Sequence, residues 1–188
     1  NNIRTPDWIE TKKDMVVNPA FYPCIVKPNA QGSTFGLSFV KEPGLLENAI
    51  NHSLAFDSNV LIEEYIGGRE ITVGVLDNEV LPIVEILPKH KLYDYECKYT
   101  PGMTNYKCPI ELDNSLKEKI NIDTIKIFEL LGCRGYGRVD YIIDNNNNHY
   151  FLEINTLPGM TSTSLLPIAA ESSGISFDDL IKKIISYI

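Results

Sequence analysis

The chain has 188 residues, 44% of them hydrophobic, and a formal net charge of -8 at pH 7. It is long enough to bury a core as one domain or two small ones. Its acidic balance argues against a nucleic-acid groove, and its apolar runs are too short for a membrane span. The four cysteines show no C-x-x-C spacing, which argues against a zinc site and favours reduced thiols in the cytoplasm.

The first third of the chain predicts a small sheet with one helix. Residues 1–20 show little periodicity and are interpreted as a lead-in segment, so we expect the chain to begin inside a longer protein. Short apolar runs on both sides of the polar segment NAQGST predict two neighbouring strands, and apolar residues at helical spacing follow them. The predicted elements are strands at residues 24–27, 35–40 and 60–65 and a helix at residues 44–56.

A second α+β subdomain is expected after Gly67-Gly68. Strands are predicted over residues 70–76 and 79–87, and the Asp77-Asn78 dipeptide between them suits a tight turn. Pro82 favours an edge position for the second of these strands. Residues 88–112 form a loop without a period, and loops of that length are usually functional covers or disordered.

Two helices are expected in this second subdomain. The first begins at Asp113 or Asn114, which can cap it, and ends before Gly132 in the C′ position. The other opens with a capping box formed by Ser176 and the acidic residue three positions later, and it runs to the C-terminus.

A β-hairpin is predicted from Gly137 to Asn155, with the Asn-rich tract DNNNN at its turn. If Asn146-Asn147 is a two-residue type I′ turn, the numbers of cross-strand partners sum to about 293. This register places Asp140 opposite Glu153 and Arg138 opposite Asn155. Strand alternation then puts these four side chains on one face of the hairpin, with apolar residues on the other. The predicted apolar face comprises Val139, Tyr141, Leu152 and Ile154.

The polar face of this hairpin has the composition of a divalent-metal site. Two carboxylates opposite each other on a sheet repel unless a positive group lies between them, and Mg²⁺ prefers such oxygen ligands together with phosphate and water. Arg138 adds a planar donor fork suited to oxyanions, and Asn155 adds a neutral oxygen before the LPGMTS loop and its N–H groups. The alternative is ordinary surface charge on a solvated face. We favour a metal site in an enzyme that acts on phosphates.

Other segments indicate phosphate or nucleotide contacts more weakly. Lys27 ends a strand beside the NAQGST loop, whose backbone and hydroxyl groups can bind phosphate, although such a lysine is more often a plain surface residue. Neither a Walker motif nor a Rossmann fingerprint occurs. The joint from Glu63 to Glu70 can bind adenosine through main-chain groups and a carboxylate, or it is simply a solvated acidic bend. In the long loop, Lys98 and Tyr99 can close over a ligand or merely lie exposed.

Several motifs in chain order resemble one enzyme family. The segments VKPNAQGSTFG, LIEEYIGGREITVGV, LYDYECKYT, GRVDYIID and FLEINTLPGMTSTSLLP are similar to the ATP-grasp half of bacterial D-alanine–D-alanine ligases, from about residue 20 onward. The resemblance implies an α+β ATP-grasp fold whose two subdomains, residues 1–66 and 67–188, have mainly antiparallel sheets that grip ATP. The family's N-terminal substrate domain is expected to be missing from this chain.

The resemblance also implies roles for individual residues. Two Mg²⁺ ions, with Mn²⁺ as a substitute, would be held by Asp140, Glu153 and Asn155. ATP would be bound by Lys27, Glu63, Glu64, Tyr65, Ile66, Glu70, Lys98 and Phe151. Arg138 and the Gly159 amide would stabilise the tetrahedral intermediate, Ser33 and Tyr99 would help lock the long loop, and Ser164 and Leu165 would bind the second D-alanine.

The implied reaction joins two D-alanines for peptidoglycan precursor synthesis: ATP phosphorylates the carboxylate of the first, and the amine of the second attacks the acyl phosphate. Tyr99 resembles the residue of dipeptide-forming members, which favours D-alanine over D-lactate as the second substrate. The full-length protein is expected to be a homodimer. The alternatives are an ATP-grasp ligase for another carboxylate and amine, and an ATP-binding module without turnover.

Overall fold

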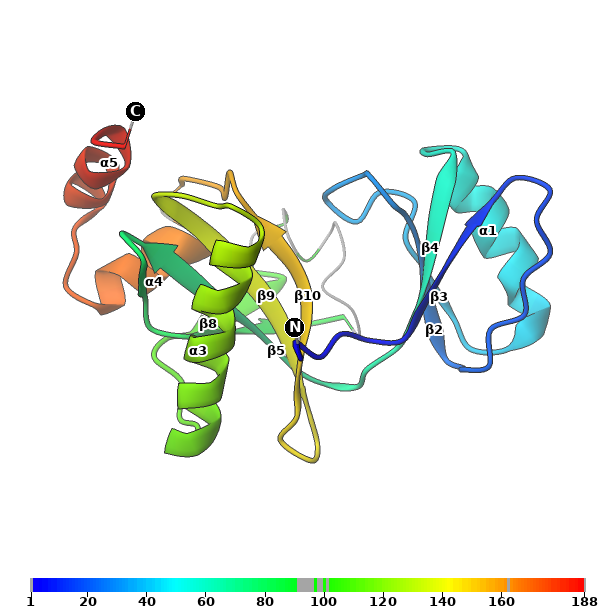
Figure 1. Ribbon diagram of the computed structural model, residues 1–188, viewed down its shortest axis with the longest axis horizontal. Helices are drawn as coiled ribbons and strands as arrows, with labels where there is room; N and C mark the ends of the chain where they lie inside the picture. The colour runs from blue at the N-terminus through cyan, green and yellow to red at the C-terminus, as the bar shows by residue number, and fades with distance from the viewer. Residues whose placement is uncertain (1, 91–96, 98–99, 101, 162, 188) are drawn as a thin grey trace. The chain divides into compact units, whose positions relative to one another are not determined.

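The computed structural model describes residues 2–90, 97, 100, 102–161 and 163–187 (Figure 1). The chain divides into two compact units. The small unit comprises residues 6–66 and 88–103, and the large unit comprises residues 1–5, 67–87 and 104–188. The division lies beside the expected Gly67-Gly68 boundary, and it assigns residues 88–103 to the small unit and residues 1–5 to the large one.

The small unit is a four-stranded antiparallel sheet with one face covered by a helix (Figure 1). Strand order is β1-β4-β2-β3. The buried core between the sheet and α1 is formed by Cys24, Val26, Val40, Leu46, Ala49, Val60 and Ile62. Its elements are β1 (Trp8–Lys12), β2 (Cys24–Pro28), β3 (Ser38–Val40), the 3-10 turn η1 (Pro43–Leu45), α1 (Leu46–Leu54) and β4 (Asn59–Glu64).

Two predictions for the small unit were wrong in detail. Strand β1 lies within the supposed lead-in segment, where it pairs with β4 from Trp8 opposite Glu63 to Lys12 opposite Asn59. The strand predicted at residues 35–40 is confined to β3. Its first residues instead belong to a turn, because Ser33, Thr34 and Gly36 all have positive φ.

The large unit contains a six-stranded sheet, with β10-β9-β5-β7-β8 in order and β6 paired to β5. All the pairings involving β5 and β9 are antiparallel. The elements are β5 (Gly68–Leu76), β6 (Glu79–Val80), β7 (Val84–Pro88), β8 (Thr104–Lys107), α3 (Asn114–Leu130), β9 (Tyr136–Asp144), β10 (His149–Asn155), α4 (Leu165–Ser172) and α5 (Phe177–Ile185).

Helices lie against both faces of this sheet. Helix α3 packs on the face that carries Val139 and Tyr141, and it contributes Ile120 and Ile127 to the core. Burial raises the pKa of Tyr141, whose hydroxyl lies 2.8 Å from the Thr124 Oγ1 of α3. Helix α4 packs on the opposite face, where a Cβ at Gly74 would lie 2.6 Å from a methyl of Leu166 on α4. The absence of a side chain at position 74 therefore admits α4.

The Asp77-Asn78 turn is confirmed, with positive φ at both residues. The following predicted strand is interrupted, because β6 ends at Val80 and β7 begins at Val84, with Pro82 between them. The expected edge position is wrong for β7, which lies between β5 and β8, whereas β6 lies off this path and pairs with β5. Strand β8 also lies within the segment expected to be a structureless loop.

The helix caps agree with the sequence. Asp113 accepts hydrogen bonds from the first turn of α3, and Gly132 has a φ of +67° just after its end. Ser176 caps α5, and its Oγ accepts from the Asp179 N–H at 3.2 Å. Helix α4 was not predicted. Its residues are apolar over most of their length, and five of the eight are buried, so no amphipathic period marks it.

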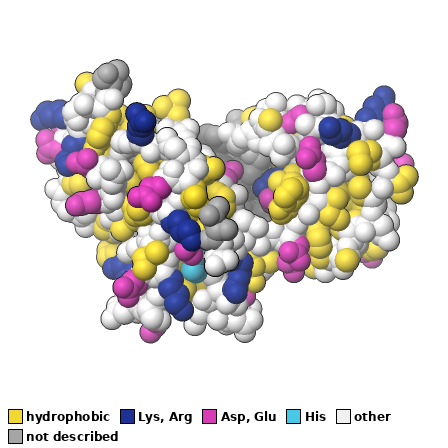
Figure 2. Space-filling model, in the orientation of Figure 1, with side chains coloured by type: hydrophobic (Ala, Val, Ile, Leu, Met, Phe, Trp, Pro, Cys, Tyr) yellow, Lys and Arg dark blue, Asp and Glu magenta, His cyan; other side chains and the backbone are white. Residues whose placement is uncertain are grey.

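Acidic and basic side chains are interspersed over both units on the face shown in Figure 2. None of the helices that the structure describes has both the length and the apolar character needed to cross a membrane.

Candidate active site

The predicted hairpin is formed by β9 and β10, but its turn differs from the expected one. Asn147 has positive φ, and the backbone N–H of Asp144 donates to Asn148 O at 2.9 Å, so the loop has three residues. The Asp144 carboxylate also accepts from the N–H groups of Asn146 and Asn148, both at 2.8 Å. The two-residue type I′ turn was therefore wrong.

A β-bulge restores the expected register farther along. Near the turn His149 pairs with Ile143 and Phe151 with Tyr141, and after a shift at Leu152 the next pair is Glu153 with Asp140. The predicted pairs of Asp140 with Glu153 and Arg138 with Asn155 are thus confirmed. Leu152 is the extra residue, so its predicted place in the apolar ladder is taken by Phe151.

The bulge sets the two faces of the hairpin. Phe151 and Ile154 pack against the buried core cluster that contains Val139 and Tyr141. Phe151 and Tyr141 also make an edge-to-face ring contact with centroids 6.2 Å apart. Phe151 therefore lies on the face opposite Asp140, and its contact with ATP stays a prediction.

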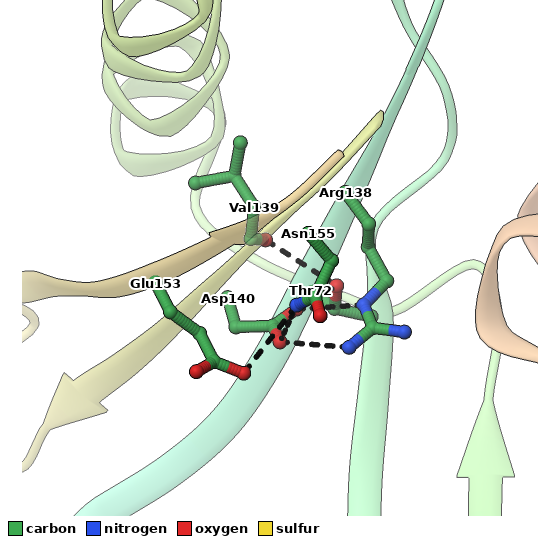
Figure 3. A network of polar contacts seen from close by, with 6 residues as sticks. All are labelled: Thr72, Arg138, Val139, Asp140, Glu153 and Asn155. Atoms are coloured by element: carbon green, nitrogen blue, oxygen red, sulfur yellow. Dashed lines mark hydrogen bonds and ion pairs between the residues drawn. The ribbon is translucent and has the colours of Figure 1, made fainter. Parts of the chain in front are cut away.

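Asp140 is the centre of a polar network on the other face (Figure 3). Its side chain is held by Arg138, whose Nε and Nη2 donate to Oδ1 and Oδ2, both at 2.9 Å. The Thr72 hydroxyl of β5 donates to Oδ1 at 2.5 Å, and the Asn155 amide donates to Oδ2 at 3.0 Å. Three adjacent strands thus fix the carboxylate of Asp140, a residue that is only 7% exposed.

Glu153 lies beside this network but is exposed. The Asn155 amide reaches its Oε1 at 3.4 Å, so Asn155 lies between the two carboxylates (Figure 3). No group of three or more His, Cys, Asp or Glu side chains in the part of the chain that the structure describes could hold a metal ion. The predicted metal site therefore depends on Asp140, Glu153 and the amide of Asn155.

The loop after β10 brings two other predicted residues together. A Cβ at Gly159 would lie 2.9 Å from the Ser164 Oγ, and this oxygen accepts from the Thr161 N–H at 3.0 Å. Ser164 is the N-cap residue of α4, and the Leu165 side chain after it is buried. Any contact of Leu165 with a substrate would therefore involve its backbone N–H, which lies in the first turn of α4.

Helix α4 begins on the same side of the sheet as the Asp140 network. Leu166 packs over Gly74, whose cross-strand partner is Arg138. Glu70 also shares this face, because Glu70 and Thr72 are two positions apart on β5 and Thr72 pairs with Asp140. Within the large unit, the predicted residues Glu70, Arg138, Asp140, Glu153 and Asn155 thus occupy one side of the sheet.

In the small unit, Lys27 and Glu63 form an ion pair at 2.6 Å. They lie on the sheet face opposite α1, because Lys27 alternates with the buried Val26 and Glu63 with the buried Ile62. The same face carries Ile25 and Trp8, both cross-strand partners of Glu63. The charged residues Glu10 and Lys12 of β1 share this face, since they alternate with the buried Thr11, so the face combines apolar surface with residues of both charges.

The segment after β4 offers a different set of groups. The Glu64 N–H donates to Asp7 O at 2.8 Å and the Tyr65 N–H to Pro23 O at 3.1 Å. The Glu64 side chain lies on the α1 face, since its partner is Cys24. Among the described residues no acceptor is found for the Ile66 N–H. The binding of adenosine by Ile66 stays a prediction.

Ser33 lies in a loop that is tied down at both ends. Asp57 accepts from the Ala30 N–H at 2.7 Å, and the Ser53 hydroxyl donates to Gly36 O at 2.6 Å. Ser33 and Thr34 are both in the left-handed region between these anchors. Lys98 and Tyr99 lie outside the described residues, so the roles predicted for them stay predictions.

A model of one protein family, described as the D-ala D-ala ligase C-terminus, matches residues 1–186. The chain belongs to this family. D-alanine–D-alanine ligases of Syntrophotalea carbinolica and Thermotoga petrophila are 44% and 41% identical to it over 165 and 187 residues. These alignments cover 88% and 97% of the chain but 54% and 61% of the relatives, so the chain spans little more than half of their length.

Solved structures of the D-alanine–D-alanine ligase family agree with the fold. The ligase of Bacillus anthracis complexed with ATP matches with a TM-score of 0.82 and 35% identity, over 98% of this chain and 60% of that one. The VanG D-Ala:D-Ser ligase of Enterococcus faecalis matches with the same TM-score and 30% identity, over 98% and 57%. The α+β fold is the ATP-grasp fold expected from the sequence.

Thr72 is a residue of the Asp140 network that sequence reasoning missed. It lies 68 positions before Asp140 and becomes its neighbour through the β5–β9 ladder. The period-two pattern of β5 could have placed Thr72 on the same face as Glu70. Its partner could not be named without the strand order.

Proposed function

We propose that this chain is the ATP- and metal-binding part of an enzyme that joins two D-alanines with consumption of ATP. The observation that carries the proposal is the family match over residues 1–186, together with a hairpin face whose oxygen donors suit Mg²⁺. Such an enzyme supplies a dipeptide for peptidoglycan precursors and is expected to work in the cytoplasm. The homodimer predicted for the full-length protein belongs to the same proposal.

The residues on the hairpin face fit a divalent metal. Asp140 and Glu153 contribute carboxylate oxygens, and rotation of the Asn155 amide by about 180° exchanges its donor for an oxygen acceptor. We propose that these three side chains hold two Mg²⁺ ions, or Mn²⁺ in their place. The metal would neutralise phosphate charge during transfer to the carboxylate of the first D-alanine.

Two cationic or dipolar groups of the large unit suit the acyl-transfer step. Arg138 carries a fork that now binds Asp140 in a bidentate manner and has the geometry to bind phosphoryl or tetrahedral oxyanions. The Gly159 N–H is proposed as a second donor to that intermediate. Ser164 and the first turn of α4 are proposed to bind the carboxylate of the second D-alanine, because helix N-termini favour anions.

In the small unit, Lys27 is proposed to bind ATP phosphate and Ile66 to bind the adenine edge. The ion pair with Glu63 holds the Lys27 ammonium on the sheet face opposite α1. Glu63 to Tyr65, Glu70 and Phe151 are proposed to contribute to ATP binding, and Lys98 to bind ATP phosphate. Ser33 and Tyr99 are proposed to help lock the long loop closed.

The test uses the full-length protein with ATP, Mg²⁺ and D-alanine. We expect D-alanine-dependent phosphate release together with D-alanyl-D-alanine detected by mass spectrometry. Phosphate release that does not depend on D-alanine would refute the ligase. ATP binding with neither phosphate release nor dipeptide would also refute it and would leave an ATP-binding module without turnover.

A different second amino acid is the alternative that one comparison favours, since the similar VanG structure is named a D-Ala:D-Ser ligase. Competing D-alanine, D-serine and D-lactate in one reaction gives the preferred nucleophile directly. We expect D-alanine, on the basis of Tyr99, and a D-serine or D-lactate product in excess would overturn that choice.

A further inference from the structure

We infer that Thr72 is a positioning residue for metal binding: its hydroxyl fixes the orientation of the Asp140 carboxylate. This inference rests on the proposed function, since it assumes that Asp140 holds the metal. The residue itself touches neither metal nor substrate in the proposal, and it acts through Asp140.

The placement of Thr72 is set by the ladder between β5 and β9. Strands β5 and β9 pair without interruption from Gly68 opposite Asp144 to Leu76 opposite Tyr136, and within this ladder Thr72 is directly opposite Asp140. Cross-strand partners share a face, so the hydroxyl and the carboxylate meet without any help from a loop. The Thr72 Oγ1 lies 2.5 Å from Asp140 Oδ1 and 3.3 Å from Val139 O (Figure 3).

The other two donors to Asp140 have competing duties in the proposed reaction. Arg138 is proposed to bind oxyanions, and Asn155 is proposed to turn its amide oxygen toward the metal. Thr72 is 1% exposed, and its hydroxyl contacts only Asp140 and the Val139 carbonyl among the described residues. Thr72 is therefore the donor that can hold Asp140 Oδ1 throughout the reaction. With Oδ1 held, Asp140 Oδ2 stays directed toward the side where Glu153 lies.

Groups that hydrogen-bond to the ligands of a metal contribute measurably to the affinity for that metal. Loss of such an outer-shell hydrogen bond typically weakens metal binding or activity by about 10- to 100-fold, because the ligand loses its orientation. Thr72→Val keeps the shape of the side chain and removes the hydroxyl, whereas Thr72→Ser keeps the hydroxyl. This pair separates hydrogen bonding from packing.

A matched control exists on the other side of the same sheet. Thr124 is also fully buried, and its hydroxyl bonds to Ile120 O at 2.7 Å and lies 2.8 Å from the Tyr141 hydroxyl. Thr124→Val removes an equivalent buried hydrogen bond without touching Asp140. Any general effect of destabilising the sheet should appear in both valine variants.

The test measures Mn²⁺ affinity of the full-length protein by electron paramagnetic resonance, with ADP at a fixed saturating concentration, and the melting temperature of each variant. We expect Thr72→Val to bind Mn²⁺ at least about tenfold more weakly, with Thr72→Ser and Thr124→Val close to wild type. Equal Mn²⁺ affinity in Thr72→Val and wild type would overturn the inference, as would an equal loss in Thr124→Val or no rescue by serine. If wild type itself binds no Mn²⁺, the proposed metal site fails first.

Discussion

Glu153 and Asp140 face each other across the hairpin, yet their replacement by the matching amides should have different effects on stability. Glu153 is exposed, and its hydrogen bond with Asn155 is long at 3.4 Å. Surface changes of this kind usually alter the free energy of unfolding by no more than about 0.5 kcal/mol. For Glu153→Gln we therefore expect a shift in melting temperature of about 2 °C or less.

Asp140→Asn should be much more damaging to the fold. The carboxylate receives a bidentate Arg138 fork at 2.9 Å, and the two side chains are 10% and 16% exposed. Removal of one member of a buried ion pair costs about 3 to 5 kcal/mol, and the partial exposure places this pair near 3. At about 2 to 4 °C per kcal/mol, the melting temperature should fall by roughly 6 to 12 °C.

Both variants should lose activity to a similar extent if the two carboxylates hold the metal. Several kcal/mol of lost transition-state stabilisation corresponds to at least about a hundredfold reduction in rate. The assay is D-alanine-dependent phosphate release by full-length protein, with thermal unfolding of the same samples. Full activity in Glu153→Gln, or a melting temperature as low as that of Asp140→Asn, would refute the assignment of Glu153 to metal binding.

Three further changes test the fold. Gly74→Ala should lower the free energy of unfolding by about 1 to 3 kcal/mol in urea denaturation, because the alanine methyl would overlap Leu166. An unchanged denaturation midpoint would mean that α4 can shift to make room. The Arg69 fork holds the pKa of Glu85 below its ordinary value. This ion pair therefore stabilises the fold fully above about pH 4.3 and less as the pH falls below that value. The loss of stability in Arg69→Met should shrink between pH 7 and pH 3, and a loss that stays constant with pH would contradict this. Asp113→Ala should lower the melting temperature through loss of the α3 cap, whereas Asp113→Ser, which keeps a capping oxygen, should stay close to wild type.

The hairpin shows what local sequence can and cannot predict. The pairing of Asp140 with Glu153 was predicted correctly from a two-residue turn, although that turn was wrong. The three-residue loop and the bulge at Leu152 each shift the register by one, so the two errors cancelled at the site. Nothing in the residues themselves separates these two solutions, because Asn suits either turn.

The elements that were missed depend on distant partners. Strand β1 is stabilised by β4, about 50 residues later, and α4 is apolar because it is buried rather than amphipathic. The contact of Thr72 with Asp140 likewise needs the order of the strands. The residues of the site that lie on the hairpin could be predicted from their spacing in the sequence, whereas Thr72 on β5 could not.

The bulge at Leu152 has a practical consequence for anyone who wishes to modify this protein. Because the register changes there, the three exposed asparagines at the hairpin tip are separated from the residues that pair around Asp140. A reporter group or a short inserted peptide at Asn146 should leave the carboxylates in place. The tip therefore offers an attachment point for a fluorophore or spin label on the same two strands that carry the proposed metal site.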